Sequence, residues 1–429
     1  MTLSLVTHRP RGTIDVLPSE IGRWHHVEHA VREVCHRFGF GEIRTPHFEH
    51  AELFVRTTGE TTDILEKETY TFTDRGGRDL TLRPEGTPGV VRAFLENGLH
   101  NEGLPAKFYY LGPMFRYDRP QAARYRQHTQ FGVETFGASG PEADFEVMMV
   151  AFALLRNLGL GDLGVQLNSI GCPECRPAFR QLLVEHFTSR SDELCSDCRR
   201  RLSRNPLRLL DCKEEACQPH KNAAPASYEH LCPACDDHFA AVQAQLRRAG
   251  IAYQLDAKLV RGLDYYTRTV FEIVYGGLGA QSTVCGGGRY DGLIEAAGGP
   301  AVAGVGFGMG IERILLTLEG EGVKLPVRDT TELFIAAAGA DNPDVRSRVW
   351  DLVFALRADG LSVETDILNR SLRQQMRYAD RRGARLVAVI GPDELESGQL
   401  KLKVMSTGQE TAATIDQLSG QVRGLLSAG

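Results

Sequence analysis

The spacing of hydrophobic residues changes several times along the chain, and each change marks a predicted element. Over residues 20–38 apolar side chains recur every three or four positions, which predicts an amphipathic helix capped by Ser19 and ended by Gly39. Residues 42–49 read as a strand, and Pro46 within it favours a place at a sheet edge or an interface. The chain is therefore predicted to open with a helix followed by an edge strand.

Two apolar runs further on predict a pair of strands. Residues 106–118 and 124–137 have strand composition, and only the polar residues 119–123 separate them. Strands joined by short loops pair in the antiparallel direction. Ahead of them, Thr87 is placed to cap a helix that starts with Pro88. These features predict a first domain of the α+β class, built on an antiparallel sheet with helices.

The pattern changes again after residues 320–331, which have the composition of a linker. From there strands and helices alternate, which predicts a separate α/β domain of about a hundred residues. We assign residues 1–325 to the first domain and residues 331–429 to the second. A cysteine-rich segment, residues 171–240, interrupts the first domain as an insertion.

Composition and charge narrow the class of protein. The chain is 42% hydrophobic and 24% charged, as ordinary soluble proteins are. No apolar run approaches the roughly 20 residues that span a bilayer, and the N-terminal residues lack the apolar core of a signal peptide, so we expect a cytoplasmic protein without membrane contact. The net charge of -6 means that any nucleic-acid contact depends on local basic patches. The sequence has no GxxxxGK[ST] loop, which argues against a P-loop nucleotide site.

Two strands carry an unusual alternation of residue types. In the run GVGFGMG, residues 304–310, the alternate glycines share one face, so either a helix crosses there closely or a flat ligand lies on the bare backbone. Arg313 in the first turn of the next helix favours the ligand, because a cation there opposes the helix dipole unless an anion is present. In residues 128–134 one face presents His128, Gln130, Gly132 and Glu134. That face is either solvated or grips a small cationic or amide-bearing ligand.

Two dense polar stretches follow, RGLDYYTRTVFE at residues 261–272 and CGGGRYDGL at residues 285–293. The first reads as a strand from its aromatic and β-branched residues. A strand does not need Arg261, Asp264 and Arg268 so close together. The two stretches together predict the polar floor of a pocket.

Eight of the ten cysteines form four close pairs between residues 172 and 235. Paired cysteines at this spacing favour structural zinc, and disulfides are rare in a reducing compartment. The alternative is a set of buried thiols that binds no metal, and the sequence leaves open which pairs would share an ion. The candidate ligands are Cys172, Cys175, Cys195, Cys198, Cys212, Cys217, Cys232 and Cys235.

These segments resemble a known family. GPMFRYDRP…RYRQ, GVGFGMGIERIL and the first helix with its Pro46 strand resemble motifs 2, 3 and 1 of class II aminoacyl-tRNA synthetases. RGLDYYTRTVFE and CGGGRYDGL look like the two signatures of histidyl-tRNA synthetases, and residues 371–395 are similar to that family's anticodon-binding domain. The resemblance covers nearly the whole chain. It implies a homodimer with a C-terminal anticodon-binding domain, which activates L-histidine with ATP and Mg²⁺ and transfers it to tRNA(His).

The resemblance also implies roles for individual residues. Arg261 and Arg116 would be catalytic, with Arg261 reaching both the α-phosphate of ATP and the histidine carboxylate. The residues implied for ATP are Arg116, Arg313, Arg261 and His128. Those implied for histidine are Glu85, Gly86, Thr87, Gln130, Glu134, Tyr265, Tyr266 and Tyr290. The chain departs from the family at Asp118, where a glutamate is usual, and at His128, where a phenylalanine commonly stacks on adenine.

Two basic stretches are candidates for tRNA contact. Five arginines lie between residues 199 and 208, in the segment that covers the acceptor end of tRNA in the family. Arg370, Arg373, Arg377 and Arg381 are spaced as one stripe of a helix, with Leu372, Met376 and Ala379 on a face that packs on the sheet. A solvated surface is the alternative for both. The alternative function is an inactive paralogue that regulates histidine biosynthesis, a type that generally lacks both the second domain and the signature arginine.

Overall fold

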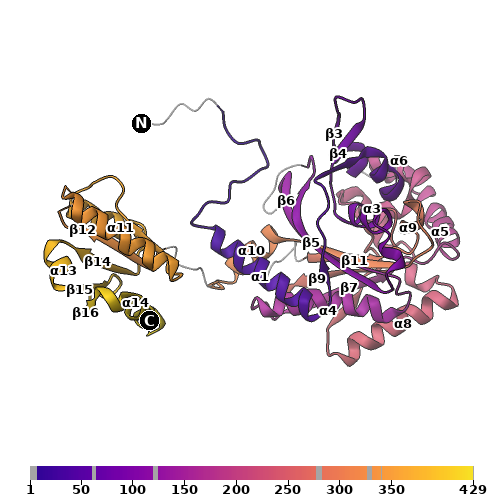
Figure 1. The fold of residues 1–429 in the computed structure, drawn as a ribbon. Helices are drawn as coiled ribbons and strands as arrows, with labels where there is room; N and C mark the ends of the chain where they lie inside the picture. Colours follow the sequence, from indigo (N-terminus) through magenta and orange to yellow (C-terminus); the bar gives the residue numbers. More distant parts are fainter. Residues whose placement is uncertain are drawn as a thin grey trace. The chain divides into compact units, whose positions relative to one another are not determined.

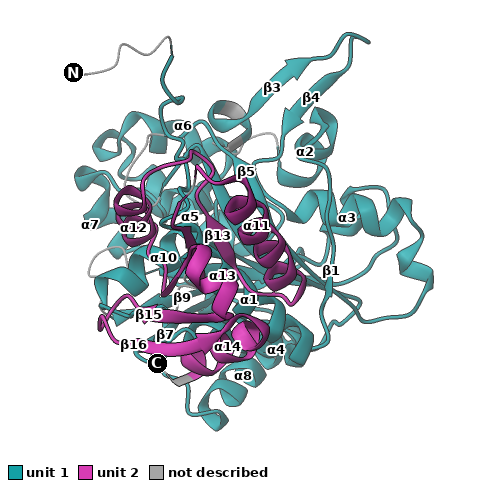
Figure 2. Cartoon of the chain, turned by 60° about the vertical axis from the view of Figure 1, so that its left-hand side comes forward, with its two compact units in different colours: residues 1–326 teal, residues 327–429 magenta. Residues whose placement is uncertain are grey.

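The computed structural model describes residues 7–59, 64–118, 124–276, 283–325, 331–339 and 341–428. The chain divides into two compact units, residues 1–326 and 327–429 (Figures 1 and 2). The predicted loop at 119–123 and residues 326–330 of the predicted linker lie outside the described residues. None of the described helices is long and apolar enough to cross a membrane.

The first unit is built on an eight-stranded sheet of order β1-β5-β6-β11-β10-β9-β7-β8. Its six inner strands, from β5 to β7 in this order, pair antiparallel, as predicted for β5 and β6. The edge strands β1 and β8 pair parallel to their neighbours. The strands are β1 (Gly41–Glu42), β5 (Ala106–Phe115), β6 (Gln127–Phe136), β7 (Leu163–Ser169), β8 (Tyr253–Leu255), β9 (Thr267–Tyr275), β10 (Thr283–Arg289) and β11 (Gly304–Gly310). A small second sheet consists of β2 (Phe48–His50), β4 (Asp79–Leu82) and β3 (Tyr70–Thr73).

Helices cover the two faces of the large sheet unequally. One face packs its largest apolar core against α1 (Ile21–Arg37), α4 (Pro141–Asn157), α8 (Pro233–Arg248) and α10 (Ile311–Gly320) (Figure 1). The opposite face packs a smaller cluster, rich in tyrosine, against α3 (Thr87–Glu96) and α9 (Leu293–Ala296). Alternation along β6 decides which side chain goes where: Phe131 and Val133 enter the large core, and Phe136 enters the smaller cluster. His128, Gln130 and Glu134 therefore face the second side.

Three local predictions need correction. Helix α1 has Glu20 as its N-cap without a side-chain hydrogen bond, so the predicted cap by Ser19 is wrong, whereas Gly39 does end the helix with a φ of 75°. Thr87 is the first residue of α3 and does not cap it. The strand predicted at 261–272 begins only at Thr267, and a bulge next to Arg268, whose φ is 49°, interrupts the first residues of β9.

The remaining helices of the first unit lie around the cysteine-rich segment and the small sheet. They are α2 (Ala51–Thr58), α5 (Arg176–Thr188), α6 (Ser196–Arg204) and α7 (Gln218–Asn222). A cluster of buried apolar residues and cysteines packs α5 against α6. The cysteine-rich segment thus has its own small core.

The second unit is an α/β sandwich, as the alternation of strands and helices predicts. Its sheet has the order β13-β12-β14-β15-β16, parallel across β13, β12 and β14 and antiparallel beyond. The strands are β12 (Leu333–Ala337), β13 (Val363–Thr365), β14 (Leu386–Ile390), β15 (Gln399–Val404) and β16 (Glu410–Thr414). The helices are α11 (Pro343–Ala358), α12 (Leu372–Arg381), α13 (Pro392–Ser397) and α14 (Leu418–Ala428). Helices α11 and α12 pack on opposite faces, because alternate residues of β12 belong to separate apolar clusters.

Candidate active site

Glu134 lies at the centre of the pocket, fully buried on β6. Its carboxylate accepts hydrogen bonds from the Thr87 hydroxyl, at 2.7 Å, and from the Tyr290 hydroxyl. The first bond explains why Thr87 does not cap α3. Its hydroxyl is directed at Glu134 on β6 and not at the backbone of its own helix. Burial raises the pKa of Glu134 to about 8. A buried carboxyl group held by neutral hydroxyls is a favourable partner for a cationic or hydrogen-bond-donating ligand.

The glycines of β11 make room for this pocket. A Cβ atom on Gly306 would lie 2.2 Å from Glu134 Oε2, and one on Gly308 would lie 2.2 Å from Gln130 Nε2. A Cβ on Gly304 would meet the ring of Tyr290 at 2.4 Å. The space above the glycines is therefore filled by side chains of the pocket. These side chains explain the glycines, whereas a crossing helix or a ligand lying flat on the bare strand does not.

Glu85 is the second buried carboxylate, located just ahead of α3 and only 4% exposed. It accepts hydrogen bonds from the Tyr265 hydroxyl at 2.7 Å and from Thr58 Oγ1 at 3.4 Å. Burial raises its pKa, and its charge in turn raises the pKa of Glu134. Two like charges on neighbouring carboxylates repel one another, and a positively charged ligand relieves the repulsion.

Four tyrosines form the wall around the two carboxylates. The ring of Tyr265 lies 4.7 Å from that of Tyr266 and 5.6 Å from that of Tyr290 between centroids. Tyr110 was missed in the sequence. It fills the space over Gly132, its partner on β6, where a Cβ would come within 2.3 Å of the ring. An aromatic residue opposite a glycine in two paired strands is a signal that could have revealed it.

Arg261 forms an ion pair with Glu272 of β9 and packs over Gly286, where a Cβ would lie 2.4 Å from its guanidinium. Its Nε is buried and has no hydrogen-bond partner among the described residues. Asp264, expected near it, accepts instead from the Asn205 amide at 2.7 Å. The guanidinium is thus oriented by one carboxylate and keeps a donor for a ligand.

The other expected cationic residues lie on the adjoining elements. Arg116 follows β5, and its Nε donates to the Pro84 carbonyl at 2.7 Å, one residue from Glu85. Arg313 of α10 donates to the carbonyl of Thr283 at 3.2 Å, and the hydroxyl of the same Thr283 donates to Glu272 at 2.6 Å. Arg313 and Arg261 are therefore linked through Thr283 and Glu272.

His128, at the start of β6, is a neutral imidazole. Burial and the nearby Arg116 lower its pKa to about 3. Asp118, the second departure from the family pattern, forms an ion pair with Arg124. A neutral ring beside Arg116 can stack on a flat heterocycle without adding charge.

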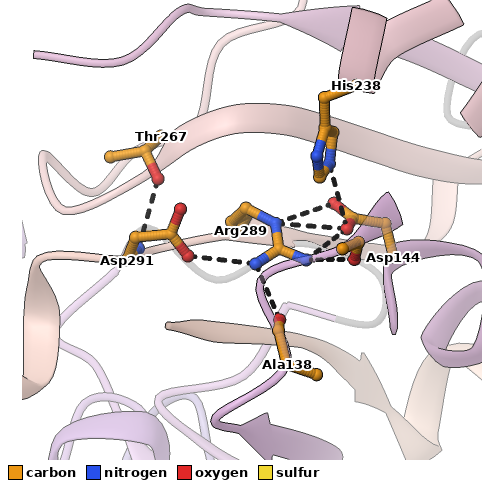
Figure 3. A network of polar contacts seen from close by, with 7 residues as sticks. Ala138, Asp144, His238, Thr267, Arg289 and Asp291 are labelled. Atoms are coloured by element: carbon orange, nitrogen blue, oxygen red, sulfur yellow. Dashed lines mark hydrogen bonds and ion pairs between the residues drawn. The ribbon is translucent and has the colours of Figure 1, made fainter. Parts of the chain in front are cut away.

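A buried ion-pair network that sequence reasoning missed supports the pocket from behind (Figure 3). Arg289, the residue before Tyr290, donates to Asp144 of α4 at 2.5 Å and to Asp291 at 3.1 Å. His238 of α8 lies 3.2 Å from the same Asp144 carboxylate. The side chains of Arg289 and Asp144 are both fully buried. Breaking such a pair is costly, so the network fixes the end of β10 that carries Tyr290.

The eight paired cysteines gather into two groups of four. One group is Cys172, Cys175, Cys232 and Cys235, and the other is Cys195, Cys198, Cys212 and Cys217. Closest sulfur–sulfur distances are 3.8 Å for Cys172 with Cys175 and with Cys232, and 3.9 Å for Cys195 with Cys212. A tetrahedral zinc ion with Zn–S bonds of about 2.3 Å holds its sulfurs roughly 3.8 Å apart. Both groups fit that ion.

Backbone amides also point at these sulfurs. The Cys172 amide donates to Cys175 Sγ at 3.2 Å, and the Cys195 amide donates to Cys217 Sγ at 3.3 Å. Burial opposes ionisation of Cys172, but surrounding amide donors lower the pKa of its thiol to about 7. Amide donors favour thiolates, the form that binds a metal, whereas burial raises the pKa of the thiols of Cys198, Cys217 and Cys235.

The arginine stripe of the second unit is shorter than predicted. Arg370 precedes α12, is held by Asp366 at 2.6 Å and stacks on Tyr378 at 4.0 Å, so it does not belong to the helical stripe. Arg373 and Arg377 are exposed on α12, as expected. Among the apolar residues, Ala379 is buried and Met376 packs on the sheet, but Leu372 is 37% exposed, so its predicted packing is wrong.

The antiparallel sheet, the β5–β6 pair with Arg116 and the β11–α10 unit with Arg313 define a class II aminoacyl-tRNA synthetase. The family model "Histidyl-tRNA synthetase" matches residues 12–314, and "Anticodon binding domain" matches residues 332–425. The chain belongs to the histidyl-tRNA synthetase family and is a histidine–tRNA ligase by class of enzyme.

The relatives match over their full length. The chain is 51% identical to the histidine–tRNA ligase of Caldanaerobacter subterraneus subsp. tengcongensis, over 98% of this chain and 100% of the relative. It is 50% identical to that of Desulforamulus reducens, over 96% and 98%. The crystal structure of apo S. aureus histidyl-tRNA synthetase matches with a TM-score of 0.82 at 38% identity, over 97% of this chain and 100% of the other. These matches, together with the second domain and Arg261, leave the regulatory paralogue the less supported alternative.

Proposed function

We propose that the pocket between β6, α3 and the tyrosines binds L-histidine for attack on ATP. The observation that carries this is the pair of buried carboxylates with raised pKa values, held only by hydroxyl donors in the described part of the chain. Glu85 receives the α-ammonium group beside Gly86 and Thr87. Glu134 and Gln130 receive the imidazole between Tyr265, Tyr266 and Tyr290. A site that satisfies hydrogen bonds in this way rejects amino acids that cannot make them.

ATP enters as its Mg²⁺ complex and meets the three arginines. Arg116 holds the α-phosphate, Arg313 holds the γ-phosphate, and the neutral His128 stacks on adenine. Guanidinium groups suit this task because their fixed fork binds phosphate oxygens in pairs. We infer that the adenine contact is the one in which this chain differs from its family.

Arg261 brings the two anionic reactants together. A histidine carboxylate oxygen attacks the α-phosphorus, a new O–P bond forms, and pyrophosphate leaves as the bond to the β-phosphate breaks. Arg261 neutralises the charge that gathers between the reactants in this step, and Glu272 keeps its guanidinium in place. In the second step a ribose hydroxyl of the tRNA 3′ end attacks the histidyl carbonyl, and AMP leaves.

Pyrophosphate exchange measured across the amino acids tests the assignment. We expect ATP–pyrophosphate exchange with histidine alone, and histidine should protect the pocket tyrosines from modification. Exchange supported equally by another amino acid, with none by histidine, would contradict the proposed substrate.

We also propose a homodimer that works in the cytoplasm. The small sheet leaves Phe48 of β2 52% exposed and Phe72 of β3 45% exposed, on the two strands that flank β4, and such exposure is unusual for large apolar side chains. A second copy of the chain covers this surface in the proposed dimer.

The proposed cytoplasmic location agrees with the ten free cysteines, because a reducing compartment keeps cysteines as thiols or metal ligands.

We propose that residues 171–240 form an insertion that binds two structural zinc ions, one in each group of four cysteines. The sulfur spacing supports this, since both groups match a tetrahedral ion. The basic residues between 199 and 208 then lie on a rigid support and contact the acceptor end of tRNA.

Freshly purified, reduced enzyme is expected to contain two zinc ions per chain by elemental analysis. Because metal binding supplies folding free energy, a chelator should make the insertion susceptible to protease before the catalytic sheet unfolds. A double substitution of Cys212 and Cys217 by serine should leave one zinc ion per chain. Reduced enzyme without bound metal would contradict the proposal.

The exposed arginines of α12 are proposed to contact the tRNA backbone. Arg373→Gln with Arg377→Gln should weaken tRNA binding about tenfold at moderate salt and reduce the salt slope by about one to two. ATP–pyrophosphate exchange should keep its parental rate, since both residues lie in the second unit.

A matched control is Arg346→Gln with Arg348→Gln. These arginines are also exposed but belong to α11, which packs on the opposite face of the same sheet, although Arg346 donates to Asn369 at 3.1 Å. Equal losses in the two double variants would mean that only net charge matters and that α12 is not the contact surface.

A further inference from the structure

The first group of cysteines lies where the chain leaves the catalytic sheet and where it returns. Cys172 and Cys175 follow β7 directly, and Cys232 and Cys235 are at the start of α8, which packs against the sheet. Gly171 is shaped for this arrangement: its φ is 71°, and a Cβ there would lie 2.6 Å from Cys175 Sγ. One metal ion bound by these four cysteines would join the point where the cysteine-rich segment leaves the sheet to the point where it returns.

A first path leads from this group to the tyrosine wall. Arg176 follows Cys175, and its Nη2 donates to the Tyr266 carbonyl at 2.5 Å and to the Gly171 carbonyl at 3.3 Å. The Arg268 amide also donates to the Gly171 carbonyl at 2.9 Å. The irregular backbone that leads into β9, and carries Tyr265 and Tyr266, is therefore attached to residues directly beside the cysteine group.

A second path leads through α8. His238 lies one turn after Cys235 and contacts Asp144, the carboxylate that holds Arg289 (Figure 3). Arg289 immediately precedes Tyr290, whose hydroxyl donates to Glu134. The helix that begins at the cysteine group thus also supports Tyr290, another member of the tyrosine wall.

We propose that Cys172, Cys175, Cys232 and Cys235 form a metal clasp that positions the tyrosines of the histidine pocket, with Arg176 as the positioning residue. The clasp rests on the proposed zinc binding and gives this ion a role in amino-acid binding. The ion itself does not touch the substrate. It joins the segment after β7 to the start of α8. Arg176 then fixes the position of Tyr266, and α8 fixes the position of Tyr290 through His238, Asp144 and Arg289. Arg261 also contacts Tyr266, but its ion pair with Glu272 of β9 gives it a second support, so loss of the clasp acts on histidine binding more than on the chemical step.

Arg176→Ala tests the transmission. It should raise KM for histidine about tenfold, the usual consequence of losing one charged hydrogen bond, with kcat and KM for ATP changed less than about threefold. Bound zinc should stay at the parental level. Arg176→Lys, which retains a donor, should recover part of the loss. Arg180→Ala is the matched control, because Arg180 lies one turn later on α5 and donates to the Arg204 carbonyl instead.

Cys232→Ser with Cys235→Ser tests the clasp itself. The double variant should lose one zinc ion per chain by elemental analysis and show the same rise in KM for histidine as Arg176→Ala. Loss of that ion with an unchanged KM would overturn the clasp and leave the proposed zinc binding intact. Parental enzyme without zinc would overturn both. A parallel fall of kcat and histidine affinity in Arg176→Ala would show a general structural role and would also overturn the inference.

Discussion

Replacing Arg261 by alanine is expected to lower kcat for histidyl-adenylate formation by at least about a hundredfold, comparable to the loss of one oxyanion-hole donor. The dissociation constant for histidine should rise far less, because the guanidinium acts mainly where two anions approach one another. Single-turnover adenylation measured at saturating histidine and ATP separates the two effects. The structure supports the assignment through Glu272, which orients Arg261, and through the buried Nε, which has no hydrogen-bond partner in the described part of the chain.

Arg261→Lys and Glu272→Gln make this test sharper. Lysine keeps the charge but loses the planar fork, so it should recover only part of the rate. Glu272→Gln keeps the shape of the orienting side chain and should reduce kcat less than the loss of Arg261 does. Equal losses of histidine binding and turnover in Arg261→Ala would identify the residue as a ground-state anchor.

Glu134→Gln should raise KM for histidine by about a hundredfold while KM for ATP stays near its original value. The substitution preserves volume, but it removes the buried carboxylate that accepts from the ligand, and an unsatisfied buried donor or acceptor costs binding free energy. Steady-state pyrophosphate exchange with each substrate varied measures both constants. A comparable rise in KM for ATP would place Glu134 outside the amino-acid pocket.

Stability against pH gives an independent check on the same variant. The folded-state pKa of Glu134, about 8, is above that of an unfolded glutamate, so its neutral form stabilises the empty enzyme at low pH. That contribution is lost as the pH rises through about 8. Relative to the parental enzyme, Glu134→Gln should therefore become more stable between pH 5 and pH 9. Thermal unfolding without ligands measures the difference, and a constant difference would show that Glu134 does not titrate in this range.

Several features of the site followed from the sequence because they depend on neighbours along the chain. The period of two along β6 placed Gln130 and Glu134 on one face, and pairing with β11 brought both over its glycines. The strand prediction for residues 261–266 was wrong. Their composition is typical of a strand, but the backbone near Arg268 is irregular and its amide bonds to the distant Gly171 carbonyl. Local propensity cannot anticipate such a contact.

The sequence by itself determined the order of most elements, the classes of the two domains and a set of candidate residues for chemistry, because hydrophobic period and short motifs are local properties. Only the tertiary structure decided what those residues touch. It joined Thr87 to Glu134 and placed Tyr110 over Gly132. It sorted eight cysteines into two groups and buried Arg289 against Asp144 across 145 positions of sequence. These contacts are set by how strands and helices far apart in the chain pack together, and packing on that scale leaves no periodic trace in the sequence.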